Sequence, residues 1–442
     1  MRYFIDPFGC AKNQVDAEHM MSRLNNAGWD TAPDAESADL IIVNSCGFIE
    51  SAKQESINAV LAWRRLYPEK KIMLAGCLAQ RYAQELAESL PEADALFGIE
   101  DISRIADAAA GLCRERGISA CGKRGEQSAG YRPLLSLPGS AYVRISDGCD
   151  NRCTFCAIPL IRGGLVCRAV PDIAEECRAL LERGVKELCI IGQDIGSYRS
   201  GDSGLPELLE AISSLTGQFW VRLLYIHPDN FPLPVLDIME RDRRFLPYFD
   251  IPFQHASGKI LRAMNRRGSA KSYCALVETI RRRLPSAIIR STFLLGFPGE
   301  SEKDFLALLD FQEQARLDWL GCFAYSREED TPAWSMPAQI PKRTAERRKR
   351  IIEERQIPIS GQNMDRFVGQ TLDVLIEEQC AHNGTAGDSA HEATYSLGRL
   401  YCHAPEVDGI ALIIGGENLK PGSMIPCTVI ARHGFDLEVQ IV

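Results

Sequence analysis

Residues 141–164 read AYVRISDGCDNRCTFCAIPLIRGG, an apolar run followed at once by three cysteines. These are Cys149, Cys153 and Cys156, in the spacing C-x3-C-x2-C. A structural zinc site or a fully ligated cubane needs four protein ligands, and no fourth cysteine or histidine stands nearby at a suitable spacing. Three thiolates on one tight loop can instead hold a [4Fe–4S] cluster with one iron open to a small molecule. We predict such a cluster; the alternatives are a zinc site and a fully ligated electron-transfer cluster.

The sequence around this loop predicts a barrel or an incomplete barrel of six β/α units, because six strand candidates alternate with helical patterns from residue 139 onward. The candidates are AYVRIS at 141–146, ELCIIG at 187–192, VRLLYI at 221–226, YFDIPF at 248–253, IIRSTFLLG at 288–296 and LGCFAYS at 320–326. In such barrels the active site lies at the carboxyl ends of the strands. Gln193 directly follows the second strand, and His227 and His255 follow the third and fourth. For the two histidines a structural role competes with a catalytic one.

Residues 1–112 also alternate between strands and helices. Short apolar runs between amphipathic helices indicate a parallel sheet covered on both faces, of the flavodoxin-like kind. Cys10, Cys46 and Cys77 each stand just past the end of one of the first three strands. Because the carboxyl ends of parallel strands meet along one edge, we expect these cysteines to converge; three unrelated semi-buried cysteines are the alternative.

The rest of the chain predicts a linker, a charged helix and a small antiparallel β-barrel. The linker candidate mixes Gly, Pro, Ser and charge without periodicity, and the C-terminal part has short alternating runs separated by turn residues. The predicted division is an N-terminal domain at 1–112, a linker at 113–138, the barrel domain at 139–340, a charged helical connector at 341–365 and the β-barrel at 366–442.

Composition restricts the class of protein. A formal net charge of −9 over 442 residues argues against nucleic-acid affinity of the whole protein. We see no signal peptide and no apolar stretch near the ~20 residues of a membrane span, so we expect a cytoplasmic protein. Sixteen cysteines in a reducing compartment favour metal ligation where they cluster and burial where they are scattered. Cys167 is near the central motif but is interpreted as non-ligating.

The cysteine motif on a six-unit barrel resembles the radical S-adenosylmethionine superfamily. The three N-terminal cysteines and the terminal β-barrel, which looks like a TRAM domain, extend the resemblance to its methylthiotransferase family along essentially the whole chain. The resemblance implies that S-adenosylmethionine binds the open iron and yields a radical that abstracts hydrogen from an unactivated carbon. It also implies that Cys10, Cys46 and Cys77 ligate a second [4Fe–4S] cluster, which holds the sulfur to be transferred. Phe155 and Gln193 are the expected contacts to S-adenosylmethionine, and no catalytic residue beyond the cluster ligands is predicted.

Several stretches resemble the branch of this family that modifies an aspartate β-carbon of small-subunit ribosomal protein S twelve. They are CGFIESAKQESI at 46–57, CAIPLIRG at 156–163, YIHPDNFP at 225–232, YFDIPFQHAS at 248–257 and APEVDG at 404–409. Residues 366–442 carry four basic and ten acidic side chains, which suits a basic ribosomal protein better than a tRNA backbone; a merely solvated acidic face is the alternative. The first alternative function is a tRNA adenosine methylthiotransferase. The second is a non-enzymatic iron–sulfur electron carrier or a zinc-stabilised scaffold.

The resemblance has two exceptions. After IRG the family usually continues with a basic run such as Arg-Tyr-Arg-Ser-Arg, where this chain has GLVCRAV and keeps only Arg168. His403 stands before APEVDG, where the family often has an acid. The resemblance also implies a low-potential electron donor, such as flavodoxin or ferredoxin, and a sulfur source as partners, besides the ribosomal protein or the small ribosomal subunit.

Overall fold

The computed structural model describes residues 1–112, 132–380, 395–415 and 418–442. Most of the predicted linker, with Cys113 and Cys121, lies outside these ranges. Within them, no helix is long and apolar enough to cross a membrane. The chain forms two compact units. The first consists of Met1–Leu135, Ser146–Val166 and Ser326–Ser335, and the second of Ser136–Ile145, Cys167–Tyr325 and Met336–Val442. These units interleave along the chain, so the predicted five-part division stays a prediction.

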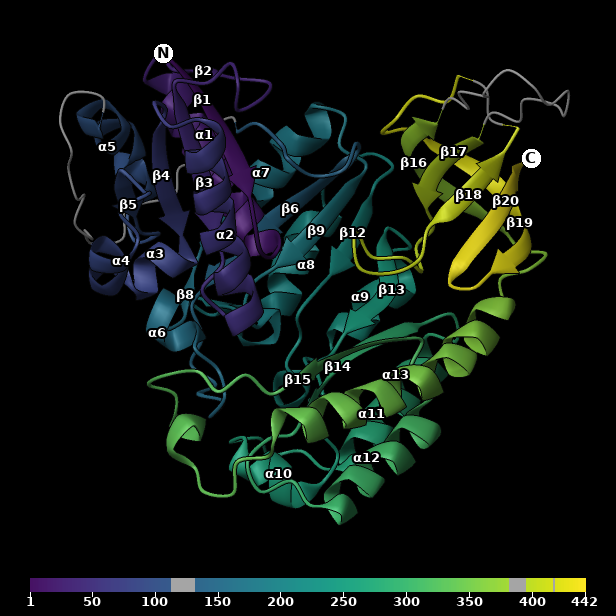
Figure 1. Cartoon of the computed structure of the whole chain (residues 1–442). Helices are drawn as coiled ribbons and strands as arrows, with labels where there is room; N and C mark the ends of the chain where they lie inside the picture. The colour runs from purple at the N-terminus through teal and green to yellow at the C-terminus, as the bar shows by residue number, and fades with distance from the viewer. Residues whose placement is uncertain (113–131, 381–394, 416–417) are drawn as a thin grey trace, which may run out of the picture. The chain divides into compact units, whose positions relative to one another are not determined.

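The first unit contains a five-stranded parallel sheet with the order β2-β1-β3-β4-β5 (Figure 1). Its strands are β1 (Arg2–Pro7), β2 (Asp30–Thr31), β3 (Leu40–Ser45), β4 (Lys71–Gly76) and β5 (Ala95–Phe97). This is the flavodoxin-like order, which confirms the expected fold. The two-residue edge strand β2 was not predicted.

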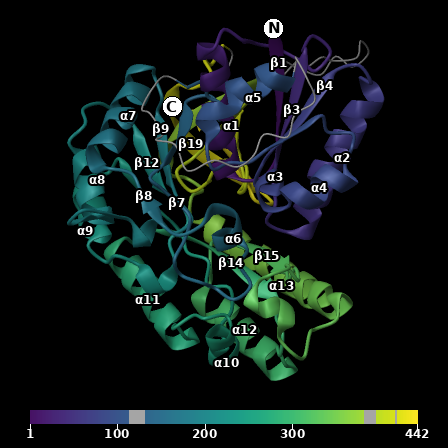
Figure 2. The same ribbon diagram turned by 90° about the vertical axis from the view of Figure 1, so that its left-hand side faces the viewer.

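Helices cover both faces of this sheet (Figure 2). Their bounds are α1 (Ala11–Asn26), α2 (Glu50–Leu66), α3 (Cys77–Arg81), α4 (Ala83–Ser89) and α5 (Ile105–Leu112). α1 and α5 pack on one face and α2, α3 and α4 on the other, each with its own apolar core. All six residues of β3 are buried, as expected for a central parallel strand covered on both sides.

The second unit contains a six-stranded parallel sheet with the order β15-β14-β13-β12-β9-β6. Its strands are β6 (Ser140–Arg144), β9 (Glu187–Ile191), β12 (Trp220–Leu223), β13 (Phe245–Asp250), β14 (Ile288–Leu295) and β15 (Trp319–Ala324). The sheet confirms the predicted partial barrel. β13 ends three residues earlier than predicted, before Pro252, which lacks the N–H that a central strand donates. Gln254 beyond it has φ 67°.

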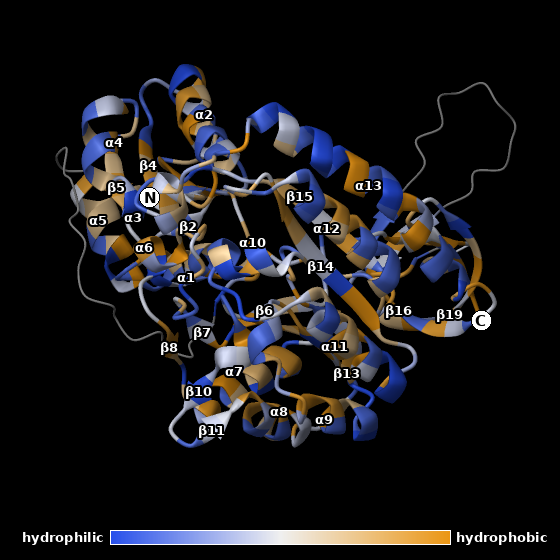
Figure 3. Ribbon diagram, turned by 90° about the horizontal axis from the view of Figure 1, so that it is seen from below, coloured by the Kyte–Doolittle hydropathy of each residue, from blue (hydrophilic) through white to orange (hydrophobic). Residues whose placement is uncertain are grey.

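Helices line the outer side of this sheet in an arc (Figure 2). They are α7 (Val170–Glu182), α8 (Leu205–Ser213), α9 (Val235–Arg241), α11 (Ala270–Arg283) and α12 (Glu302–Ala315). The predicted charged connector is α13 (Lys342–Asp365), which continues through Pro358. Hydrophilic turns of α13 are interrupted by hydrophobic ones (Figure 3). It packs against β15, and Ser360 Oγ donates to Asp318 O at 2.6 Å, so α13 belongs to the barrel wall.

The C-terminal strands close into a small barrel with the order β16-β17-β18-β20-β19. They are β16 (Thr371–Cys380), β17 (Tyr395–Arg399), β18 (Ala411–Ile414), β19 (Met424–His433) and β20 (Asp436–Ile441). The closed barrel confirms the prediction, although β17 was not predicted. One strand pair, β18 with β20, is parallel rather than antiparallel.

A buried ion network joins the amino ends of the six-stranded sheet to this small barrel. Glu187 Oε1 accepts from Arg222 Nε at 2.7 Å and Glu187 Oε2 from Arg399 Nη2 at 2.5 Å, and none of the three side chains is more than 1% exposed. Burial raises the pKa of Glu187, but Arg399 and Arg222 outweigh burial and lower it to about 2. Tyr248 adds a second contact, donating to Asp408 Oδ2 at 2.6 Å.

His403, which stands where the family often has an acid, lies in the interface between the six-stranded sheet and the small barrel. Its ring is fully buried, and burial, with Arg399 and Arg222, lowers its pKa to about 3. His227, at the other end of the sheet strands, has its pKa lowered to about 4 by burial and then by Arg266. Both histidines are therefore neutral in the folded protein at neutral pH. The charge of Arg399 is balanced by Glu187 and Glu377.

These two histidines predict acid sensitivity of the second unit. Below pH ~6.5 the unfolded chain protonates both rings, whereas the folded protein does so only near pH 4 or lower. The unfolded state thus binds more protons, and the free energy of unfolding falls as the pH falls from 6.5 to 4, by about 1.4 kcal/mol per pH unit for each ring. Urea unfolding at several pH values should give a shallower dependence for His403→Gln. An unchanged dependence would contradict the burial of a neutral ring.

Candidate functional site

The three N-terminal cysteines converge at the carboxyl edge of the first unit's sheet. Cys10 caps α1, Cys46 directly follows β3, and Cys77 opens α3 directly after β4. Asn13 Oδ1 lies 3.4 Å from Cys10 Sγ and 3.6 Å from Cys77 Sγ. A Cβ added to Gly9 would lie 3.0 Å from Cys46 Cβ. The structure therefore brings these residues together, while their ligation of a cluster stays a prediction.

Local backbone geometry explains the convergence. Asn13 is held in place because its Nδ2 donates to Ser45 O at 2.7 Å, and Asn44 Nδ2 donates to Asn13 O at 2.8 Å. Gly76 has φ 100°, and a Cβ there would lie 2.6 Å from Ser45 O, so only glycine allows the turn that leads from β4 to Cys77. The same asparagine thus links the edge of the sheet to two thiols.

The three thiols differ in acidity. Burial raises the pKa of Cys46, and raises that of Cys77 to about 12. Burial acts in the same direction on Cys10, but Lys12 and Arg162 outweigh it and lower the pKa of that thiol. Iron ligation requires thiolates, so loading a cluster at this edge must release protons. The three sulfur donors lie close together and have the cationic Lys12 and Arg162 beside them. This arrangement fits a cluster held by three thiolates.

The central motif forms a tight loop after β6. Cys149 N donates to Gly163 O at 3.2 Å, which closes the loop, and Cys156 N donates to Cys153 O at 3.0 Å. Gly148 has φ 70°, and a Cβ there would lie 2.1 Å from Gly164 O, so the closure requires glycine. The three cysteines of the motif are partly exposed, as is Phe155, and their role as ligands stays a prediction.

Neither triplet is arranged around a single ion position. Among the described residues, no three His, Cys, Asp or Glu side chains form a group that could hold one metal ion. The case for two cubane sites therefore rests on the donor type and on the convergence and loop closure described above.

Helix α6 (Ile158–Arg162) connects the two triplets and was not singled out from the sequence. It begins two residues after Cys156 and packs on Cys77 through Ala157 and Ile161. Arg162 Nη2 donates to Cys77 Sγ at 3.2 Å and to Asp16 Oδ2 at 2.6 Å. The only signal in the sequence was the position of IRG at the end of the motif.

A second unpredicted connection is the segment that follows β15. Glu328, whose side chain is 2% exposed, accepts from Arg81 Nη1 at 2.8 Å and from Lys53 Nζ at 3.1 Å. Farther along, Ala333 N donates to Thr154 O at 2.9 Å, between the second and third cysteines of the central motif. This segment therefore contacts both the N-terminal sheet domain, at the end of α3, and the central loop.

The carboxyl ends of the second unit's strands hold Gln193 and a polar network. Gln193 Nε2 is buried and has no hydrogen-bond partner among the described residues, so a donor is left for a ligand. Asp194 accepts from His227 N at 2.9 Å and from Asn230 Nδ2 at 2.8 Å, which ties the loops after β9 and β12 together. His255 Nδ1 accepts from two backbone N–H groups at 2.9 Å. His227 Nδ1 accepts from Asp229 N at 3.2 Å, which favours the structural interpretation of that ring. His255 Nε2 is buried without a hydrogen-bond partner among the described residues, so the contacts of His255 fit either interpretation.

The segment that departs from the family pattern makes ordinary structural contacts. Arg168 donates to Arg144 O at 2.8 Å and pairs with Glu176 at 2.5 Å. Cys167 Sγ accepts from Arg199 N at 3.3 Å. The remaining arginine thus links the end of β6 to the middle of α7.

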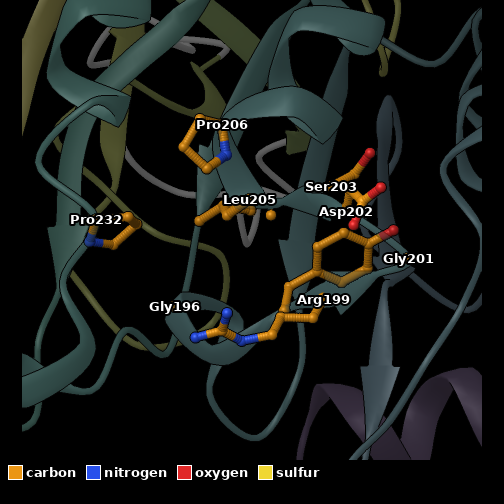
Figure 4. A pocket seen from close by; sticks show the side chains of 10 residues that line it. Gly196, Arg199, Gly201, Asp202, Ser203, Leu205, Pro206 and Pro232 are labelled. Atoms are coloured by element: carbon orange, nitrogen blue, oxygen red, sulfur yellow. The ribbon is translucent and has the colours of Figure 1, made fainter.

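A hollow of about 350 Å³ lies beside the hairpin of β10 (Arg199–Ser200) and β11 (Ser203–Gly204). Figure 4 shows the apolar Leu205, Pro206 and Pro232 on one side of it and Asp202 and Ser203 on the other. The hollow was not predicted, and its lining contains none of the predicted site residues.

Comparisons with known proteins decide the family. Three family models match in order along the chain: "Uncharacterized protein family UPF0004" at residues 2–98, the radical SAM superfamily at 143–311 and the TRAM domain at 368–442. A protein of Treponema denticola named ribosomal protein uS12 methylthiotransferase RimO is 43% identical, over 99% of this chain and 100% of that protein. Proteins of the same name from Syntrophomonas wolfei and Carboxydothermus hydrogenoformans are each 38% identical, the first over 97% of both chains and the second over 100% of both. The chain belongs to the RimO family of methylthiotransferases.

Membership in the RimO family makes this chain an enzyme, a radical S-adenosylmethionine methylthiotransferase. Its radical SAM domain implies S-adenosylmethionine and a [4Fe–4S] cluster as cofactors. Solved structures show the same fold at low identity. The radical S-adenosylmethionine methyltransferase TsrM of Kitasatospora setae matches with TM-score 0.55 and 13% identity over 75% of this chain and 74% of that one. The cobalamin-dependent radical enzyme OxsB matches with TM-score 0.51 and 12% identity over 80% of this chain and 56% of that one.

Proposed function

We propose that this RimO family member replaces a C–H bond by C–S–CH3 at the β-carbon of an aspartate in ribosomal protein uS12. The names of its relatives give this ribosomal protein as their substrate. The observation that carries the proposal is the presence of two cysteine triplets in one compact unit, connected by α6. Such a pair suits a reaction that needs both a radical and a sulfur. A non-enzymatic electron carrier would need no six-stranded partial barrel in the same chain.

The chain's own residues take distinct roles in this proposal. Cys149, Cys153 and Cys156 hold the cluster that binds S-adenosylmethionine, and the N-terminal triplet holds a second cluster. When bound, the first cluster with S-adenosylmethionine supplies a radical able to remove hydrogen from an unactivated carbon, which is chemistry of the cofactors rather than of the protein. Gln193 Nε2 donates a hydrogen bond to S-adenosylmethionine, and Phe155 lies against its adenine.

The substrate is proposed to be a protein because the TRAM domain is acidic. Ten acidic and four basic side chains in residues 366–442 attract a basic ribosomal protein and repel a phosphate backbone. The other proposed partners are a low-potential electron donor such as flavodoxin or ferredoxin and a sulfur source. The proposed location is the cytoplasm, where ribosomal proteins are assembled.

The decisive experiment offers the enzyme both substrates at once. Enzyme reconstituted anaerobically with iron and sulfide would be incubated with S-adenosylmethionine, dithionite, unmodified small subunits and unmodified tRNA. Mass spectrometry of uS12 peptides should show one methylthio group in place of hydrogen on an aspartate, with tRNA nucleosides unchanged. Modification of adenosine without modification of uS12 would overturn the proposal in favour of the tRNA alternative.

The orphaned amide of Gln193 gives a prediction for cofactor binding. Gln193→Leu keeps the volume but removes the donor, so we expect S-adenosylmethionine to bind roughly tenfold more weakly, the worth of one hydrogen bond. Anaerobic equilibrium dialysis measures this, and the iron content should not change. Gln54→Leu, which removes an exposed amide on α2, should leave the affinity as it is. Equal affinities of wild type and Gln193→Leu would remove Gln193 from the binding site.

A further inference from the structure

We propose that Arg162 is a positioning residue that brings a permanent positive charge to the N-terminal cluster and sets the potential at which that cluster is reduced. The inference rests on the proposed function, since it takes Cys10, Cys46 and Cys77 as ligands of a second cluster. It adds a residue from the central motif to the environment of that cluster.

Arg162 contacts elements of both triplets. Its Nη2 donates to Cys77 Sγ at 3.2 Å and to Asp16 Oδ2 of α1 at 2.6 Å, while its Nη1 lies 3.3 Å from Asp147 Oδ1. Asp147 stands two residues before Cys149, and Arg162 stands six residues after Cys156. One guanidinium group is therefore held by the central loop and reaches a sulfur of the other triplet.

Burial makes this charge effective. The side chains of Arg162 and Asp16 are each 1% exposed, and that of Asp147 is 23% exposed. An arginine does not lose its proton in a protein, and a buried charge is kept only where it is paired. Screening by water is weak at such a site. The guanidinium group therefore places a full positive charge beside the sulfur of Cys77, and the negative charge of Asp16 offsets part of its effect.

This placement has a direct consequence for an iron–sulfur cluster. Hydrogen bonds to the ligand sulfurs and the charge around a cluster set its reduction potential. Reduction adds a negative charge, which a cation at 3.2 Å from a ligand sulfur stabilises. Arg162 thus favours the reduced cluster, whereas Asp16 disfavours it. Lys12, which is 6% exposed, adds a second cation beside Cys10.

The test measures the potential of the N-terminal cluster alone. The parent protein for this test has Cys149, Cys153 and Cys156 replaced by alanine. Redox titrations monitored by electron paramagnetic resonance would compare this parent with its Arg162→Gln and Arg162→Lys variants. Arg162→Gln should lower the reduced-to-oxidised ratio at a given potential at least tenfold, since one charge near 4 Å is worth several times RT even at an effective dielectric of ~20. Arg162→Lys should retain most of the effect, because it keeps the charge.

Two further variants keep the test decisive. Asp16→Asn should shift the ratio in the opposite direction, toward the reduced cluster, and this decides the matter if Arg162→Gln fails to load iron. Arg64→Gln is the control. Arg64 belongs to the same unit and pairs with Asp94, which precedes β5 and lies at the edge of the sheet away from the cysteines. This change should leave the reduced-to-oxidised ratio unchanged.

The outcomes separate the two proposals. A cluster with the same potential in Arg162→Gln as in the parent overturns the role of Arg162 and leaves the proposed function intact. A potential that Asp16→Asn leaves unchanged or shifts toward the oxidised cluster also overturns it. If the triple-alanine background holds no [4Fe–4S] cluster, the second cluster and with it the proposed function fail.

Discussion

Simultaneous replacement of Cys149, Cys153 and Cys156 by alanine is expected to abolish S-adenosylmethionine cleavage and to leave about half of the iron. Two four-iron clusters correspond to roughly eight iron atoms per chain, and the variant should retain roughly four, bound by the N-terminal triplet. The reason is that the cluster proposed to bind S-adenosylmethionine is held by these three cysteines, whereas the cluster that remains is proposed to hold the sulfur to be transferred. Iron analysis and detection of 5′-deoxyadenosine under reducing conditions measure the two effects.

The reciprocal variant is the control for this prediction. With Cys10, Cys46 and Cys77 replaced by alanine, cleavage of S-adenosylmethionine should persist, the iron content should again be about half, and methylthio transfer to uS12 should be lost. Cys167→Ala is the matched single control, because its thiol accepts a backbone hydrogen bond and is predicted not to ligate iron. Cleavage that survived in the first variant would refute the assignment of the central motif.

Much of the fold could be predicted because it depends on short-range patterns. Buried runs such as 40–45 alternate with amphipathic helices, and the two parallel sheets follow from that alternation. Predictions were wrong where a local signal was weak or misleading. Strand β2 has only two residues, and β17 buries the polar Ser396 and Arg399, so neither strand shows apolar residues at the positions that face a core.

The candidate site, too, could be predicted from the sequence only where its signal is local. Spacing identified the central motif, and the ends of the strands identified Cys10, Cys46 and Cys77. Arg162, Asp16 and Glu328 were missed because their partners are distant in sequence, as with the 146 positions between Arg162 and Asp16. Only the folded chain shows which of the many charged residues are buried against a thiol. Such long-range ion pairs leave no periodic trace in the sequence.

The second large effect is expected from Glu187→Gln, which should destabilise the second unit by about 3–5 kcal/mol. The side chains of Arg222 and Arg399 are 0% and 1% exposed. Without the Glu187 carboxylate their positive charges are not fully balanced, and an unpaired buried charge costs about 3–5 kcal/mol. The depressed pKa of Glu187 adds a pH signature. Its contribution is present above pH ~4.3 and is lost as the pH falls toward 2, so the difference from wild type should shrink over that range.

Urea unfolding read by hydrogen exchange in β9 and β17 would measure this loss at both sides of the interface. Glu210→Gln is the matched control, since it breaks the ion pair with Arg241, in which both side chains are about half exposed (51% and 54%), and should cost under about 1 kcal/mol. If the loss comes from the orphaned charge rather than from poor packing of glutamine, the double variant Glu187→Gln/Arg222→Met should be more stable than Glu187→Gln alone. A double variant that is less stable than the single one would show that Arg222 contributes through its donation to Tyr401 O at 2.9 Å more than it costs as an unpaired charge.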